Sequence, residues 1–109
     1  GAVFATGQNT FGLYGVDFEN GKNVTNLVDI ASSSPVVVDM CHFVNISTTP
    51  RAAQFSTCAN VVFTRNRMTG FAAGRIVIFD EQCQKVMCYN NDLGDGERTG
   101  RYIMNRSQV

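Results

Sequence analysis

Cysteine and histidine are the residues of this chain whose types and spacing could support catalysis or metal binding. The chain has four cysteines and a single histidine. His42 directly follows Cys41 in an apolar, strand-like run, so the two side chains point to opposite faces and cannot act as a thiol nucleophile and its base. Zinc sites need sets such as two closely spaced cysteines with paired histidines, which Cys83, Cys88 and one distant histidine do not supply. The residues therefore predict no catalytic centre, no metal site and no cofactor.

The even number of cysteines in a short chain is typical of secreted proteins with disulfide bonds. We predict that Cys41, Cys58, Cys83 and Cys88 form two such bonds. In an extended strand the Cα atoms of Cys83 and Cys88 would lie roughly 16 Å apart, whereas a disulfide tolerates less than about 7 Å. This spacing argues against a bond between those two, and leaves open which of them pairs with Cys41 and which with Cys58.

Three glycosylation sequons also indicate the secretory route. Their acceptors are Asn23, Asn45 and Asn105. The chain opens Gly-Ala-Val-Phe without a basic start and an apolar block, as expected of a mature or trimmed form. No apolar run approaches the roughly 18 residues that span a bilayer, so we expect no membrane span. The predicted location is extracellular.

Arginines gather in the second half of the chain and are candidates for partner binding. Residues 1–50 hold four acids against Lys22, whereas residues 51–109 hold seven arginines and Lys85 against five acids. The candidate binding residues are Arg65, Arg67, Arg98, Arg101, Tyr102 and Arg106. Arginine and tyrosine are enriched at interface hot spots, and arginine recognises carboxylate and phosphate. We expect a protein or an anionic surface ligand, and the balanced net charge argues against nucleic acid; the alternative is a polar terminal strand that faces water.

Short apolar stretches separated by Gly, Asn, Asp and Ser predict the strands that must position these residues. The expected strands are Val3–Thr6, Leu13–Phe18, Val36–Ile46, Asn60–Thr64, Arg75–Phe79, Lys85–Tyr89 and Tyr102–Met104. Helices are expected in two places. In residues 23–35 the side chains of Val24, Leu27, Val28 and Ala31 share one helical face. After Thr49, Pro50 can begin one or two turns.

No repeat, low-complexity tract or linker is evident, so residues 1–109 are predicted to form one domain. The expected fold is mainly β, a small antiparallel sandwich or barrel-like sheet with one or two short helices, stabilised by disulfides. In such a fold residues 75–92 would form a β-hairpin.

The stretch AAGRIVIFDEQCQKVMCYNN, residues 72–91, resembles the hairpin of small fungal guanyl-specific ribonucleases. The resemblance implies that Arg75 is the arginine at the head of one strand. The place of the catalytic histidine falls near Asn90 or Asn91, which cannot act as a general acid at neutral pH. No glutamate lies between Glu19 and Glu81 to serve as the base. A ribonuclease-like protein of this sequence would therefore be catalytically degenerate.

The sequence thus favours a small secreted, disulfide-stabilised binding protein without catalytic activity. Its composition and cysteine count are typical of the effector, toxin or defence type, with a fungal source as one expectation. The alternative is a secreted protein with a ribonuclease-like fold.

Overall fold

Every regular element that the structure describes is a β-strand. The computed structural model describes residues 3–19, 26–44, 51–70, 77–80, 82–92 and 102–104 of the 109-residue chain. The strands are β1 (Val3–Thr6), β2 (Phe11–Tyr14), β3 (Asp17–Glu19), β4 (Asn26–Ala31), β5 (Val36–Asp39), β6 (His42–Val44), β7 (Arg51–Ser56), β8 (Ala59–Thr64), β9 (Arg67–Thr69), β10 (Val77–Phe79), β11 (Gln84–Tyr89) and β12 (Tyr102–Met104). No membrane-crossing helix occurs in this part of the chain.

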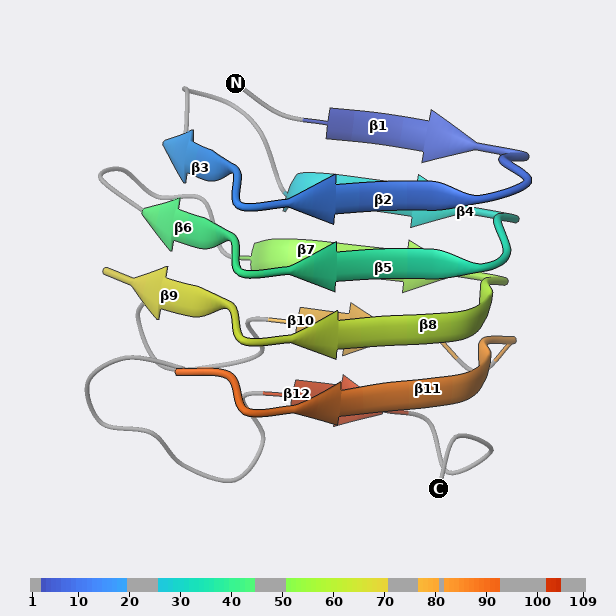
Figure 1. Ribbon diagram of the computed structural model, residues 1–109. Helices are drawn as coiled ribbons and strands as arrows, with labels where there is room; N and C mark the ends of the chain where they lie inside the picture. Colours follow the sequence, from blue (N-terminus) through green and yellow to red (C-terminus); the bar gives the residue numbers. More distant parts are fainter. Residues whose placement is uncertain are drawn as a thin grey trace.

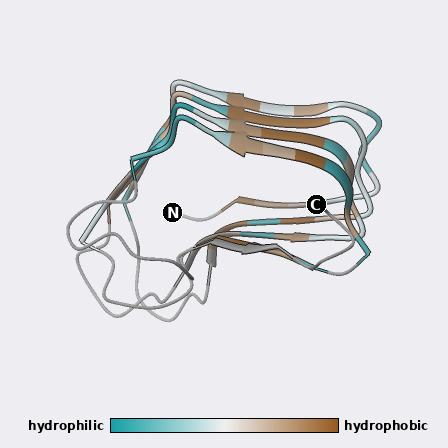
Figure 2. Ribbon diagram, turned by 90° about the horizontal axis from the view of Figure 1, so that it is seen from below, coloured by the Kyte–Doolittle hydropathy of each residue, from teal (hydrophilic) through white to brown (hydrophobic). Residues whose placement is uncertain are grey.

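The strands form three parallel sheets around one axis, which is a parallel β-helix (Figure 1). Sheet A contains β1, β4, β7, β10 and β12; sheet B contains β2, β5, β8 and β11; sheet C contains β3, β6 and β9. Each strand pairs with the strand one turn later, as in Val3 with Val28 and Phe11 with Val36. One turn, here called a coil, therefore takes 25 residues. Figure 2 looks along the axis and shows sheets A and B facing each other across the interior.

This architecture contradicts the predicted antiparallel sandwich or barrel. Within the described residues there is no helix, and the segment expected to be helical contains strand β4. Leu27 and Val28 suggested a helical face because they are adjacent and apolar, and both are in fact fully buried in the β-helix. The strands beside each other in a sheet are one coil apart in sequence, so their connection is a full turn of the chain and not a hairpin.

The core consists of inward-pointing side chains stacked from coil to coil. Phe18 and Phe43 are register partners and stack with ring centroids 4.9 Å apart. Phe55 and Phe79 do the same at 5.0 Å, in sheet A. Phe63 of β8 lies edge-on to both of these rings, at 5.9 and 6.3 Å, and so joins the two facing sheets. The apolar alternation of the strands thus fills the interior with columns of like residues.

The corner after sheet B turns through a residue with positive φ in every described coil. Gly15, Met40, Arg65 and Asn90 occupy this position, 25 residues apart, with φ between 54 and 62°. A left-handed conformation costs free energy for a residue other than glycine, and so needs local compensation. The next position in the chain supplies it, because its side chain hydrogen-bonds to the backbone of the coil before.

Asparagines provide that compensation at two coils. Asn66 is 1% exposed, and its Oδ1 accepts a hydrogen bond from the Cys41 N–H at 2.9 Å while its Nδ2 donates to the Val38 carbonyl at 3.0 Å. Asn91 repeats this arrangement one coil later, with the Asn66 N–H at 2.9 Å and the Phe63 carbonyl at 3.0 Å. The column pairs buried backbone groups that the turn would otherwise leave without partners.

Cysteines occupy similar corner positions, and this explains why the prediction of disulfides was wrong. All four cysteines are free thiols; Cys41, Cys58 and Cys83 are buried, and Cys88 is partly buried. Cys58 and Cys83 stand one coil apart, and their thiols hydrogen-bond to the carbonyls of Ile30 and Phe55 at 3.4 and 3.3 Å. The cysteines therefore serve as small corner residues with a weak donor and not as covalent crosslinks.

These thiols have perturbed acidities. The hydrogen bond with Cys83 lowers the pKa of Cys58, and the same contact together with burial raises the pKa of Cys83. Burial raises the pKa of Cys41. The opposed shifts at Cys58 and Cys83 mean that the stacked pair loses at most one proton, because two adjacent buried thiolates would repel each other.

Residues 75–92 do not form the predicted hairpin. Val77–Phe79 belongs to sheet A, whereas Gln84–Tyr89 belongs to sheet B, and both run parallel to their neighbours. The turn between them is one residue longer than its counterpart one coil earlier, since Val77 to Val86 spans nine positions and Ala53 to Val61 spans eight. Asp80 stabilises the longer turn, because its Oδ1 accepts hydrogen bonds from the N–H groups of Gln82 and Thr57 at 2.9 and 3.1 Å.

Candidate functional site

The predicted arginine cluster is not brought together among the described residues. Arg65 lies at the corner after β8, and Arg67 lies in β9 of sheet C. Tyr102 lies in β12, and only its backbone is described. The remaining predicted binding residues (Arg98, Arg101, Arg106), the sequon residues (Asn23, Asn45, Asn105) and Arg75 lie outside the described residues. Of the predicted set, Arg65 alone belongs to the site described next.

The outer face of sheet B presents two rows of side chains, each with one residue per coil. One row contains Tyr14, Asp39, Thr64 and Tyr89, and the other contains Gly12, Val37, Val62 and Met87. Register partners in neighbouring strands lie about 4.8 Å apart, so each row runs parallel to the helix axis. We call these two rows, with Asn60, Lys85 and Arg65, the sheet B face.

An ion pair lies in the middle of the sheet B face. The Arg65 Nε donates to Asp39 Oδ1 at 2.9 Å, and its Nη2 donates to Oδ2. Thr64 Oγ1 donates to the same Oδ1 at 3.0 Å. The hydrogen bond from Arg65 holds the pKa of Asp39 below its usual range, and the pKa of Arg65 is raised in turn. The carboxylate is thus fully paired, while the arginine side chain stays 58% exposed and retains donors that face solvent.

Two tyrosines stand at the ends of the same row, and both are exposed. Tyr14 is 60% exposed and Tyr89 is 51% exposed. The Tyr14 ring lies back over Gly12, because a Cβ at position 12 would come within 2.6 Å of its Cε2 and 3.2 Å of its Cζ. The absence of a side chain at Gly12 therefore provides the space in which the ring rests on the sheet.

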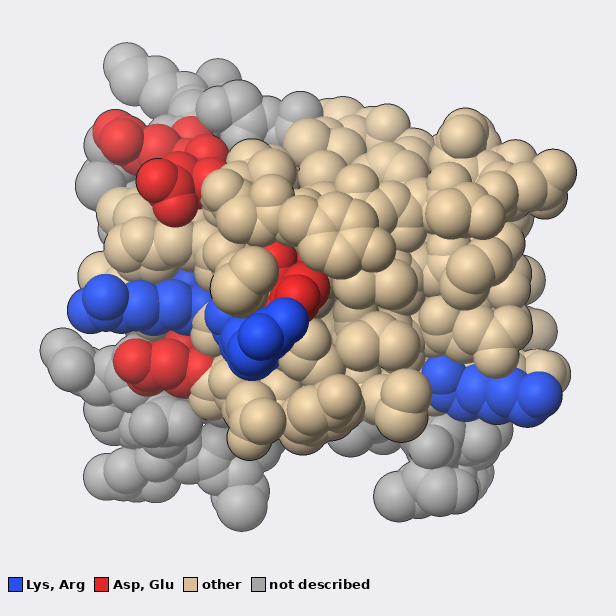
Figure 3. All heavy atoms as spheres, viewed as in Figure 1, with Lys and Arg blue, Asp and Glu red and all other residues tan. Residues whose placement is uncertain are grey.

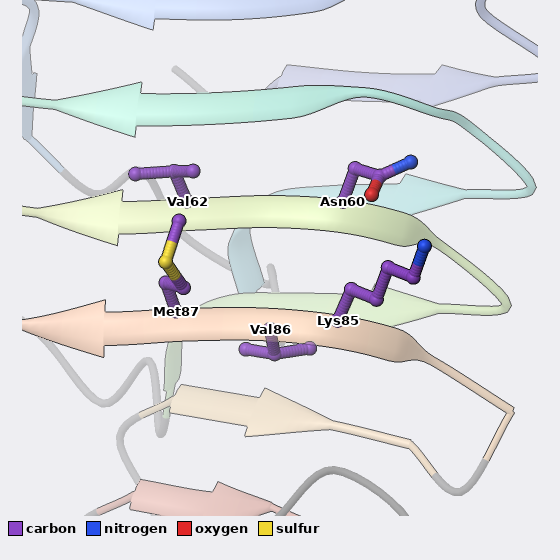
Figure 4. Close-up of a pocket in the computed structure, with 5 residues that line it drawn as sticks. All are labelled: Asn60, Val62, Lys85, Val86 and Met87. Atoms are coloured by element: carbon purple, nitrogen blue, oxygen red, sulfur yellow. The ribbon is translucent and has the colours of Figure 1, made fainter.

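A shallow hollow of about 320 Å³ lies beside this row (Figure 4). It is lined by Asn60, Val62, Lys85, Val86 and Met87. The floor is apolar, and the polar ends of Asn60 and Lys85 lie at one side of it, as Figure 4 shows. Met87 is 53% exposed and forms part of the opposite side.

Charge is concentrated away from the sheet B face. Figure 3 shows this side of the molecule, where the surface over β2, β5, β8 and β11 is almost entirely uncharged. The central ion pair and Lys85, near the start of β11, are the exceptions. Acids and an arginine gather instead on sheet C, where Asp17 and Glu19 lie in β3 and Arg67 pairs with Asp92 at 4.0 Å.

Sheet C carries His42 in a row with Asp17 and Arg67, its register partners on either side. The imidazole Nε2 lies 2.9 Å from Thr69 Oγ1. No group of three or more metal-binding side chains occurs among the residues that the structure describes. The described part of sheet C therefore offers a polar, charged surface in which the histidine is hydrogen-bonded to a threonine.

The Asp39–Arg65 pair is expected to make stability depend on pH. Because the pKa of Asp39 is lowered in the folded state, its contribution is present above the ordinary carboxyl range near pH 4 and is lost as the pH falls through the folded pKa. The D39N variant should therefore melt at a lower temperature than the original protein at neutral pH, and the difference should shrink in acid. Thermal melts followed by circular dichroism between about pH 2 and pH 7 would measure this.

The matched control is R65M, which leaves the carboxyl group without its guanidinium partner. In that background the replacement of Asp39 by Asn should change the melting temperature far less, and with little dependence on pH. An equal effect of D39N with and without Arg65 would contradict the assignment.

A comparison with protein families, with curated proteins and with solved structures found no match to this chain. The function must therefore be argued from the geometry. The sequence analysis missed Tyr14, Tyr89, Gly12 and Asp39 as site residues. The available signal was their spacing, because Tyr14 and Tyr89 are separated by three coils of 25 residues with Asp39 at the first step.

Proposed function

We propose that this protein is a non-catalytic binding module and that it binds its ligand through the sheet B face. One observation carries the proposal: exposed aromatic and apolar side chains gather on a nearly uncharged surface of paired strands. Exposed apolar surface of this kind is typical of interaction sites, and aromatic side chains dominate binding energy.

The rigidity of the support favours binding. Every residue of the sheet B face except Arg65 belongs to a hydrogen-bonded strand, and Arg65 is held by two hydrogen bonds to Asp39. A surface that is ordered before the ligand arrives loses little conformational entropy on binding. Sites built on strands also hold their side chains more accurately than sites built on loops.

The same residues do not support catalysis. Asp39 is the acid of the sheet B face, and its lowered pKa keeps it an ionised partner of Arg65, which suits neither a general acid nor a base that works near neutral pH. The ribonuclease alternative rested on a hairpin over residues 75–92, and those strands lie in two different parallel sheets.

Secretion, and with it the effector, toxin or defence role, remains part of the proposal. It rests on the three sequons, since the cysteines that supported it are free thiols. A secreted module with a preformed face would act by attachment to a molecule outside the cell.

The proposed function predicts that ligand binding depends on Tyr14 and Tyr89. The protein contains no tryptophan and three tyrosines, so its intrinsic fluorescence reports largely on this face. A titration panel of oligosaccharides, peptides and mononucleotides should contain a class that changes the fluorescence. The Y14A/Y89A variant should bind that class about tenfold or more weakly, as expected for the loss of two exposed aromatic contacts.

The matched control is F4A. Phe4 is 68% exposed, but it lies on sheet A beside a separate hollow of about 290 Å³. F4A should bind as the original protein does. Equal losses in F4A and Y14A/Y89A, or full binding by Y14A/Y89A, would place the site elsewhere.

A further inference from the structure

We propose that the sheet B face binds a glycan chain, laid along the row from Tyr14 to Tyr89 with a sugar ring stacked on Tyr14. This inference rests on the proposed function and names its ligand class.

The position of the Tyr14 ring is the first argument. A phenol ring that lies back over Gly12, with 60% of the residue exposed, presents an aromatic surface to solvent while its other side is supported by the sheet. The C–H-rich face of a pyranose ring stacks on such a surface, since both are flat and the aromatic face is electron-rich. The glycine makes this platform, because any Cβ at position 12 would displace the ring.

The spacing of the row is the second argument. Tyr14 and Tyr89 are three coils apart, which corresponds to about 14 Å along the axis. Between them lie Thr64 and the Asp39–Arg65 pair, whose exposed guanidinium donors and oxygens suit sugar hydroxyl groups. Aromatic rings at two ends with hydrogen-bonding groups between them match a short run of sugars, which alternate apolar ring faces with hydroxyl edges.

The size and charge of the sheet B face argue against other macromolecules. Four strands and about four residues of each strand give an area on the order of 200 Å², whereas a stable protein interface needs about 800 Å² on each partner. Nucleic acid would need several phosphate-binding cations. On this face Arg65 is already paired with Asp39, which leaves Lys85. A glycan segment fits the area and needs no charge.

The test uses hexasaccharides of β-1,4-glucose, N-acetylglucosamine, mannose and galacturonic acid, each titrated into the full chain by isothermal calorimetry. At least one should bind, and Y14A should weaken that binding about tenfold or more. G12A is the decisive variant, because it keeps the tyrosine but moves its ring off the sheet. It should weaken binding about as much as Y14A, whereas Y14F and F4A should bind like the original protein.

Each variant is first checked for the circular dichroism spectrum and melting temperature of the original protein. Full binding by a folded G12A would overturn the stacking platform, and a folded Y89A that binds normally would overturn the course of the chain along the row. If no hexasaccharide binds, the glycan proposal fails. In that case peptide or mononucleotide binding that is lost in Y14A/Y89A would leave the binding function standing, and the absence of any such binding would remove both.

Discussion

Replacement of Phe63 by alanine is expected to lower the free energy of unfolding by about 3–5 kcal/mol. Phe63 is fully buried, and its ring lies 6.3 Å from Phe43, 5.9 Å from Phe55 and 6.3 Å from Phe79. Truncation removes contacts with rings from all three sheets at once. The strands around the side chain are fixed by hydrogen bonds to their neighbours, so the cavity cannot close easily.

Urea unfolding followed by circular dichroism measures this loss. The control is V62A in the same strand, because Val62 points outward and its truncation leaves no interior cavity; its cost should be under about 1 kcal/mol. The total stability expected for a domain of this size is about 5–15 kcal/mol, so F63A could unfold completely. F63L then provides a smaller, measurable loss. A loss from F63A no larger than that from V62A would contradict the packing described for the core.

Replacement of Asn66 by alanine is expected to cost about 2–5 kcal/mol, although Asn66 is a polar residue at a corner. Its side chain pairs the Cys41 N–H and the Val38 carbonyl, and each of these backbone groups would be left buried without its partner. Each unpaired buried group costs about 1–3 kcal/mol. The same denaturant titration gives the value.

Asn91 offers the matched comparison, because it makes the equivalent two hydrogen bonds one coil later but is only partly buried. Water can replace part of what its side chain supplies, so N91A should cost clearly less than N66A. Equal costs, or a cost for N66A below about 1 kcal/mol, would show that the corner does not depend on these hydrogen bonds.

The positions of the strands could be predicted from the sequence, but their pairing could not. Val3–Thr6 was expected and is β1, and the expected strand Asn60–Thr64 lies within β8. The expected strand at Val36–Ile46 is divided at Met40, whose positive φ no local pattern indicates. Alternation of apolar residues decides which side chains face inward, and says nothing about whether the neighbouring strand is parallel and one coil away.

The 25-residue period is hard to recognise because each interior column accepts different apolar residues. Ile30, Phe55 and Phe79 share one column, and apolar side chains of such different size leave no sequence similarity. The polar corners carry the clearer signal, since Cys58 and Cys83 are one period apart and so are Asn66 and Asn91. Read as disulfide partners, the cysteines concealed the repeat that they mark.

The candidate site was hidden by the same difficulty. Tyr14 and Tyr89 lie 75 positions apart in the sequence and share a row only because three parallel pairings bring them to one face. Gly12 resembles an ordinary turn residue until the ring over it is seen. Arginine, in contrast, was singled out by its residue type, and only Arg65 reaches this surface.

The longer turn between β10 and β11 shows where this fold can absorb insertions and deletions. The chain from Ala53 to Val77 is one position short of a full coil, and the extra residue before Val86 restores the count, so Val61 and Val86 remain 25 positions apart. A change of length at a corner is therefore tolerated when a second corner offsets it. Inside a strand, the same one-residue change would exchange inward and outward side chains over the rest of that strand. Evolutionary change in the length of such a chain is thus confined to its corners.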